Sequence, residues 1–98
     1  MTTKSNAVII TETFPLGQVC ATAGVAEEVS FIELMSALQR HTKGDWGELD
    51  PEDWAENELS LKEGFRLLSA YRSSRGVKFW IITEADRTAT TILLPNEN

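Results

Sequence analysis

The sequence predicts a single small α+β domain, in which one or two short N-terminal strands, one main amphipathic helix and a short second helix precede a C-terminal three-stranded antiparallel meander. Three observations indicate this class. Apolar residues recur with helical spacing in residues 31–42, a helix-start pattern lies at residues 50–53, and alternating apolar runs separated by turn residues fill residues 65–94. Helices followed by consecutive strands are typical of α+β domains.

Length and composition favour one domain. The chain has 98 residues, of which 42% are hydrophobic and 24% charged, which suffices for one hydrophobic core but not for two. We take residues 1–98 as the domain, with residues 1–6 disordered and residues 96–98 as a tail. The apolar run at residues 7–10 is too short for a signal peptide or a membrane span, and the single cysteine, Cys20, fits a reducing compartment, so a cytoplasmic protein is expected.

The N-terminal region contains two short β-compatible runs, residues 7–12 and 18–22, separated by Pro15 and Gly17. Proline and glycine in this position are typical of a turn, so the two runs are predicted to form a hairpin. Thr22 then caps a short helical turn over residues 24–29.

The first long helix is predicted over residues 31–41. Ser30 and Glu33 have the spacing of a capping box, in which each side chain accepts a hydrogen bond from the other residue's amide. Gly44 follows the helix and ends it. An apolar stripe that must face a core consists of Phe31, Leu34, Met35, Leu38 and either His41 or Thr42.

The second helix starts at Asp50, a capping residue, with Pro51 at the first helical position and acids in the first turn. We expect it to end near Leu61, with Gly64 beyond it.

The meander comprises strands at residues 65–72, 77–85 and 88–94, joined by turns at residues 73–76 and 86–87. Its register is predicted by placing Arg72 opposite Val77 and Ala85 opposite Thr88. The face expected to pack on the first helix then holds Leu68, Ala70, Phe79, Ile81, Thr83, Thr90, Ile92 and Leu94. We expect the second helix with Trp54, or a second copy of the chain, to cover part of the other face, which holds Leu67, Ser69, Tyr71, Lys78, Trp80, Ile82, Glu84, Thr91 and Leu93.

Charge is unevenly distributed and favours a protein partner. The net charge is −6, with −8 in residues 1–61 and +2 in residues 62–98. An acidic chain is a poor ligand for nucleic-acid phosphates, which are bound by Lys and Arg, so direct nucleic-acid binding is not expected. A basic surface of another protein suits the acidic half better.

Residues 41–58 hold seven carboxylates and two tryptophans, and are the main candidate for a binding surface. A helix start and a solvated helix face explain part of the acidity, and each tryptophan can instead fill a core pocket. The carboxylates lack the order of a calcium loop, so no metal or other cofactor is predicted. The predicted binding residues are Asp45, Trp46, Glu48, Asp53, Trp54, Asp86 and Arg87.

Two alternatives remain open. The first is a small nuclease-like enzyme, in which His41 acts as acid or base, Arg66, Arg72 or Arg87 stabilises phosphate, and Glu84 assists. Against it, His41 also fits the last turn of a helix, where it interacts with the helix's negative end. The chain has neither a Gly-x-Ser-x-Gly elbow nor a phosphate-binding glycine loop. The second is a homodimer that forms through Trp80, Tyr71 and Leu93.

A resemblance to a known family rests on four segments: Gln18-Val-Cys-Ala-Thr-Ala-Gly, His41-Thr-Lys-Gly-Asp-Trp-Gly, Gly64-Phe-Arg-Leu-Leu-Ser-Ala-Tyr-Arg and Trp80-Ile-Ile-Thr-Glu-Ala-Asp-Arg-Thr-Ala-Thr-Thr-Ile-Leu-Leu-Pro. Across residues 17–95 the chain resembles a family of short, uncharacterised bacterial proteins associated with plasmids and other mobile elements. The resemblance implies a genetic context and no activity. Its motif positions favour a polar site in which Glu84, Asp86 and Arg87 meet the loop at residues 44–47.

The leading hypothesis is therefore a non-enzymatic interaction protein of a mobile element. It is expected to dock through its acidic, tryptophan-bearing loop and helix onto another protein, such as a defence or replication factor.

Overall fold

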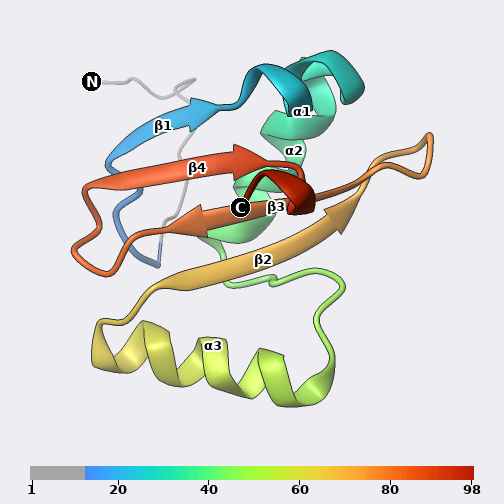
Figure 1. The fold of residues 1–98 in the computed structure, drawn as a ribbon. Coiled ribbons are helices and arrows are strands. Elements are labelled where there is room, and N and C mark those ends of the chain that lie inside the picture. The colour runs from blue at the N-terminus through green and yellow to red at the C-terminus, as the bar shows by residue number, and fades with distance from the viewer. Residues whose placement is uncertain (1–12) are drawn as a thin grey trace, which may run out of the picture.

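A four-stranded mixed sheet forms the centre of the computed structural model, which describes residues 13–98 (Figure 1). Its strands are β1 (Gln18–Ala21), β2 (Leu67–Arg72), β3 (Lys78–Thr83) and β4 (Ala89–Leu93), in the order β1-β4-β3-β2. β1 is parallel to β4, and the other neighbours are antiparallel. The helices are α1 (Ala23–Glu28), α2 (Phe31–Thr42) and α3 (Pro51–Glu63), followed by the 3-10 turn η1 (Pro95–Glu97). The predicted α+β class is confirmed.

The helices begin where capping residues predict. The side chains of Thr22, Ser30 and Asp50 each accept a hydrogen bond from the backbone N–H three residues later. Only half of the predicted capping box forms, because the Glu33 carboxylate accepts hydrogen bonds from the backbone N–H and hydroxyl of Ser74, at 2.7 and 3.0 Å. Glu33 therefore ties α2 to the turn between β2 and β3. Within residues 13–98, no helix is long and apolar enough to cross a membrane.

β1 pairs with β4, a neighbour that the sequence did not predict, with Gln18 opposite Ala89 and Ala21 opposite Ile92. Residues 7–12, the predicted hairpin partner, and residues 1–6 lie outside the described part of the chain. At the other end, the predicted tail includes η1, whose Glu97 carboxylate accepts a hydrogen bond from the Thr22 hydroxyl at 2.6 Å.

The predicted register of the meander is correct for β3 and β4 and is wrong by one residue for β2 and β3. Thr83 lies opposite Thr90, as predicted, whereas Arg72 lies opposite Lys78 and not Val77. The turn closes one residue later than expected, with the Ser73 N–H donating to the Val77 carbonyl at 2.9 Å. Gly76 has a φ of +86°, which suits a three-residue hairpin loop.

A slip of one residue turns every side chain of a strand to the opposite face. The correction therefore reassigns β2: Leu67, Ser69 and Tyr71 lie on the helix-covered face, and Leu68 and Ala70 lie on the outer face. The faces predicted for β3 and β4 are unchanged, because their mutual register is as predicted.

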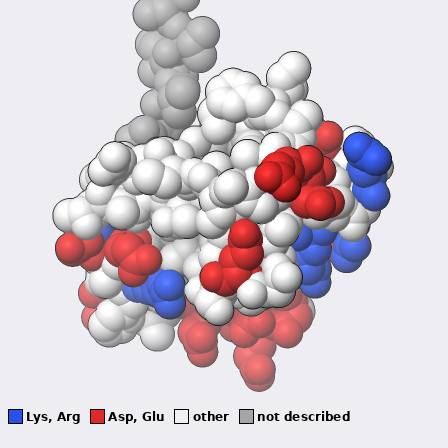
Figure 2. Space-filling model, turned by 45° about the horizontal axis from the view of Figure 1, so that its top comes forward, with Lys and Arg blue, Asp and Glu red and all other residues white. Residues whose placement is uncertain are grey.

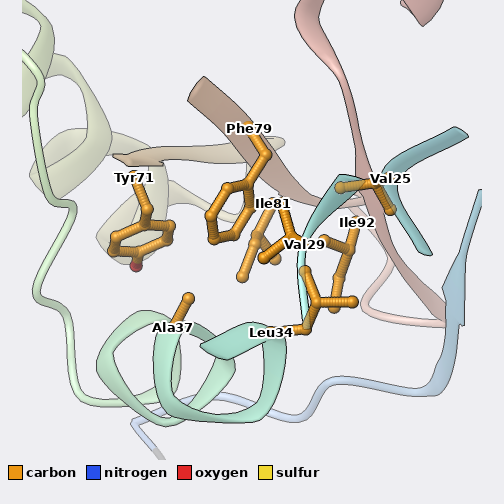
Figure 3. Close-up of a cluster of buried hydrophobic side chains, with 8 residues drawn as sticks. All are labelled: Val25, Val29, Leu34, Ala37, Tyr71, Phe79, Ile81 and Ile92. Atoms are coloured by element: carbon orange, nitrogen blue, oxygen red, sulfur yellow. The ribbon is translucent and has the colours of Figure 1, made fainter. Parts of the chain in front are cut away.

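The main core lies between the sheet and helices α1 and α2 (Figure 3). Tyr71, Phe79 and Ile81 of the sheet face Leu34 and Ala37 of α2, and all five are at most 4% exposed. The predicted stripe on α2 is thus correct except at its first position, since Phe31 is 71% exposed. A second cluster, formed by Phe14, Trp46 and Leu67 with partly buried neighbours, lies toward α3.

Candidate functional site

Trp46, a predicted binding residue, is fully buried and serves the second core cluster. Its ring packs against Phe14 and His41, with ring centroids 6.2 and 5.7 Å apart, and its indole N–H donates to the Glu58 carboxylate at 2.7 Å. The indole is therefore not presented to a partner. Trp54 is half-buried against the same cluster.

The loop at residues 44–47 is held against the edge of β2. The Ala70 N–H donates to the Trp46 carbonyl at 3.1 Å, and the Glu48 N–H donates to the Ala70 carbonyl at 2.7 Å. Gly47, with a φ of +77°, makes this approach possible, because a Cβ there would lie 2.0 Å from the Ala70 carbonyl oxygen. Trp46, which is buried, and Gly47, which is half-buried, thus serve the fold.

Asp45 stabilises the same loop. Its carboxylate accepts hydrogen bonds from the Arg40 guanidinium at 2.7 Å and from the Gly47 N–H at 3.1 Å. The Arg40 contact holds the pKa of this carboxyl below its usual value. The Tyr71 hydroxyl donates to the Asp45 carbonyl at 2.7 Å. Asp45 is therefore committed to internal contacts, although its side chain is 44% exposed.

His41 is fully buried and connects α2 to two strands. Its Nε2 lies 2.8 Å from the Thr83 hydroxyl, and its Nδ1 contacts the Ser69 hydroxyl. The series of hydrogen bonds continues from the Thr83 hydroxyl to the Thr90 hydroxyl, 2.8 Å away. The Thr90 hydroxyl in turn donates to the Leu16 carbonyl at 2.7 Å.

This series of hydrogen bonds determines which atom is the donor and which the acceptor in each of them. Thr90 donates to a carbonyl, so it must accept from Thr83; Thr83 has no further proton, so the His41 Nε2 must donate to it. Burial, reinforced by the charge of Arg87, lowers the pKa of His41 to about 3, so the imidazole is neutral. Its Nδ1 then accepts from the Ser69 hydroxyl, and every partner is satisfied. His41 has the environment of a structural histidine.

The residues predicted for a nuclease do not converge on an accessible site. His41 has an exposed fraction of 0%. Arg66 forms an ion pair with Glu84, at 3.5 Å. The Arg87 guanidinium donates to backbone carbonyls, including that of Phe65 at 2.7 Å. In this conformation no substrate phosphate reaches the imidazole.

The polar site predicted at the end of the sheet is not assembled either. The Asp86 carboxylate accepts from the hydroxyl and N–H of Thr88, at 2.7 and 3.1 Å, whereas Asp45 bonds to Arg40 and Gly47. Among the described residues, no hydrogen bond or ion pair joins Asp86 or Arg87 to the loop at residues 44–47.

The predicted dimer residues are divided between the two faces of the sheet. Tyr71 pairs with Phe79 on the helix-covered face and is 1% exposed, while Trp80 and Leu93 lie opposite each other on the outer face. Leu93 is only 6% exposed. Of the three, Trp80 alone is partly accessible.

A groove lies between α3 and the outer face of the sheet. Its cavity volume is about 550 Å³. Asn57 anchors α3 beside it by donating to the Leu68 carbonyl at 2.6 Å and accepting from the Leu68 N–H at 3.1 Å. These two bonds satisfy backbone groups at the edge of β2, so α3 is fixed alongside the strand (Figure 1).

The walls of this groove differ in chemistry. Asp53 and Glu56 line it from α3, and neither takes part in the three ion pairs found in the described residues. Leu68, Ala70 and Trp80 form an apolar floor on the outer sheet face. Figure 2 shows acidic side chains along the lower margin of the molecule, where α3 lies in Figure 1.

Other charges around the groove are partly neutralised. Glu48 pairs with Arg72 at 3.2 Å, and Arg66 pairs with Glu84. Lys78 lines the groove on the side of β3. Asp50, Asp53 and Glu56 belong to none of these ion pairs, against one such cation, Lys78, so the lining keeps an excess of negative charge.

The sequence contained part of the signal for this groove. Asp53, Glu56, Asn57 and Ser60 have the spacing of one helix face, and all four line the groove. The floor was missed because the predicted register placed Leu68 and Ala70 on the helix-covered face. No group of three or more His, Cys, Asp or Glu side chains in residues 13–98 is arranged to hold a metal ion.

Comparisons with known proteins find no match to this chain among family models, curated proteins or solved structures. The resemblance to mobile-element proteins therefore stays a prediction.

Proposed function

We propose that the chain is a small interaction protein that binds an extended basic segment of another protein in the groove between α3 and the outer sheet face. The observation that carries this proposal is the pairing of an acidic wall, Asp53 and Glu56, with an apolar floor that includes Trp80. Opposite charge steers and orients a partner, and a partly exposed indole both packs on apolar groups and attracts cations.

The dimensions of the groove favour an extended segment. Lining residues of α3 run from Asp53 to Ser60, which corresponds to about 10 Å of helix at 1.5 Å per residue. An extended chain covers that length in about three to four residues. Because its side chains alternate, basic ones can face α3 while apolar ones lie on Leu68 and Trp80.

The genetic and cellular context belongs to the same proposal. The resemblance found in the sequence supports a mobile-element protein whose partner is a defence or replication factor, acting in the cytoplasm.

The test uses a fluorescently labelled extended peptide with Lys or Arg at alternate positions and leucine between them. Anisotropy should show saturable binding that weakens as salt is raised. The double variant Asp53→Lys with Glu56→Lys should weaken binding at least tenfold. Neither side chain forms a hydrogen bond or an ion pair in the described residues, so the fold should be retained, as circular dichroism can verify.

The matched control is Glu27→Lys with Glu28→Lys, which changes the net charge equally on the exposed surface of α1. It should alter affinity less than twofold. Equal losses in the two double variants would mean that total charge, and not the groove, attracts the peptide, and would refute the proposal.

A further inference from the structure

The outer edge of β1 carries backbone groups that no other strand of residues 13–98 pairs with. The Gln18 N–H donates to the Thr88 carbonyl and the Thr22 N–H to the Ile92 carbonyl, both at 3.0 Å. Alternate residues of a strand point their backbone groups to opposite sides, so Val19 and Ala21 direct theirs away from β4. Within residues 13–98, no strand pairs with this edge, and all four residues of β1 are exposed.

An apolar hollow of about 250 Å³ lies beside this edge. Val19 and Ala21 contribute to it from β1, because they are in register with Thr90 and Ile92 on the helix-covered face. Phe31 and Met35 line it from α2, and no charged residue lines it. Phe31 is 71% exposed, which is unusual for a large apolar side chain next to an apolar hollow.

We propose that this edge and hollow bind a second copy of the chain, with the two β1 strands antiparallel across a two-fold axis. Such an axis brings identical surfaces together, so each copy supplies both an open edge and an apolar hollow. The uncharged lining matters, since two chains of net charge −6 repel least where neither presents charge.

The register of this pair follows from the strand itself. Gly17 has a φ of +65°, so the extended segment begins at Gln18. Val19 and Ala21 carry the outward backbone groups. If Val19 of each copy lies opposite the partner's Ala21, two such residue pairs form, and every outward N–H and C=O group is hydrogen-bonded. Cys20, which is exposed and free, then faces the partner's Cys20 with Cα atoms about 4.5 Å apart, within the range of a disulfide.

The first measurement is sedimentation of the full chain over about 10 µM to 1 mM, since so short a strand pair predicts a weak, concentration-dependent dimer. The second is oxidation by diamide, which removes two electrons and two protons from the two facing thiols and becomes the hydrazine. Wild type should yield a disulfide-linked dimer on a non-reducing gel. Cys20→Ser should abolish this product yet sediment as the wild type does.

Two variants test whether dimer formation depends on the proposed interface and not on a general change in the fold. Phe31→Asp places an acid in the first turn of α2, where the helix dipole favours it, and adds like charge beside the two-fold axis. It should raise the dimer Kd at least tenfold and slow disulfide formation. Leu59→Asp is the control, because Leu59 is 54% exposed on α3, and it should leave both measurements unchanged.

Other occupants of the edge give different results. If the protein stays monomeric and the Val19 and Ala21 amides exchange slowly with solvent, residues of the same chain cover this edge. If it stays monomeric and these amides exchange rapidly, the edge is open and a different protein is its partner. Each result overturns the second-copy proposal without affecting the groove on the opposite side of the sheet.

Discussion

His41 joins α2 to two strands through buried hydrogen bonds. Its partners Ser69 and Thr83 lie 28 and 42 residues further along the chain, on strands whose register decides whether they face α2. The packing of α2 on β2 and β3 therefore depends on the protonation state of this one buried side chain.

The buried His41 makes a specific prediction about stability and pH. Folding lowers the pKa of His41 from 6.5 to about 3, so between these values the unfolded chain binds a proton that the folded chain does not. The free energy of unfolding must therefore fall as pH falls below about 6.5. Between pH 7 and pH 5 the loss should be about 2 kcal/mol, at 1.36 kcal/mol per pKa unit.

Urea denaturation at the two pH values measures this loss, with His41→Gln as the matched variant. Glutamine keeps a donor and an acceptor but does not titrate, so its free energy of unfolding should change little in this window. The carboxyls with lowered pKa, including Glu33 and Asp45, weaken stability only at lower pH. An equal pH dependence in wild type and variant would mean that His41 is not buried as a neutral imidazole.

At the scale of elements, the loop at residues 44–47 acts as an extra pairing partner for β2. Helix starts were predictable because Thr22, Ser30 and Asp50 are local signals. The loop was not, because nothing within its own sequence shows that it pairs with Ala70, 23 residues after Gly47. Its acidic and aromatic composition suggested a binding surface, whereas Trp46 and Asp45 are used internally.

Replacing Gly47 tests this pairing. Gly47→Ala combines a φ of +77° with a Cβ 2.0 Å from the Ala70 carbonyl oxygen, so the loop must move away from β2. We expect a loss of at least about 3 kcal/mol in the free energy of unfolding. Gly76→Ala is the control, since Gly76 has a similar φ of +86° and no atom within 4 Å of the added Cβ. It should cost about 1 kcal/mol, and equal losses by urea denaturation would show that the loop does not pack closely on β2.

At the scale of the whole molecule, the acidic charge and the concave surface coincide at α3. The sequence indicated the acidic half and the helix face that carries Asp53 and Glu56. It did not indicate the groove, which exists because Asn57 holds α3 beside β2 and because Leu68 and Trp80 lie on the outer face. Folding thus turns a solvated helix face into one wall of a site with an aromatic floor.

A basic segment that binds in this groove must leave the loop at residues 44–47 unoccupied. NMR can follow a titration of isotope-labelled protein with the alternating Lys-Leu peptide. We expect the largest changes in chemical shift at the Trp80 indole N–H and at the amides of Asp53, Glu56 and Leu68, with the Trp46 indole N–H little affected. If the largest changes fell at residues 44–47, or spread evenly over every acidic residue, the peptide would not bind in the groove.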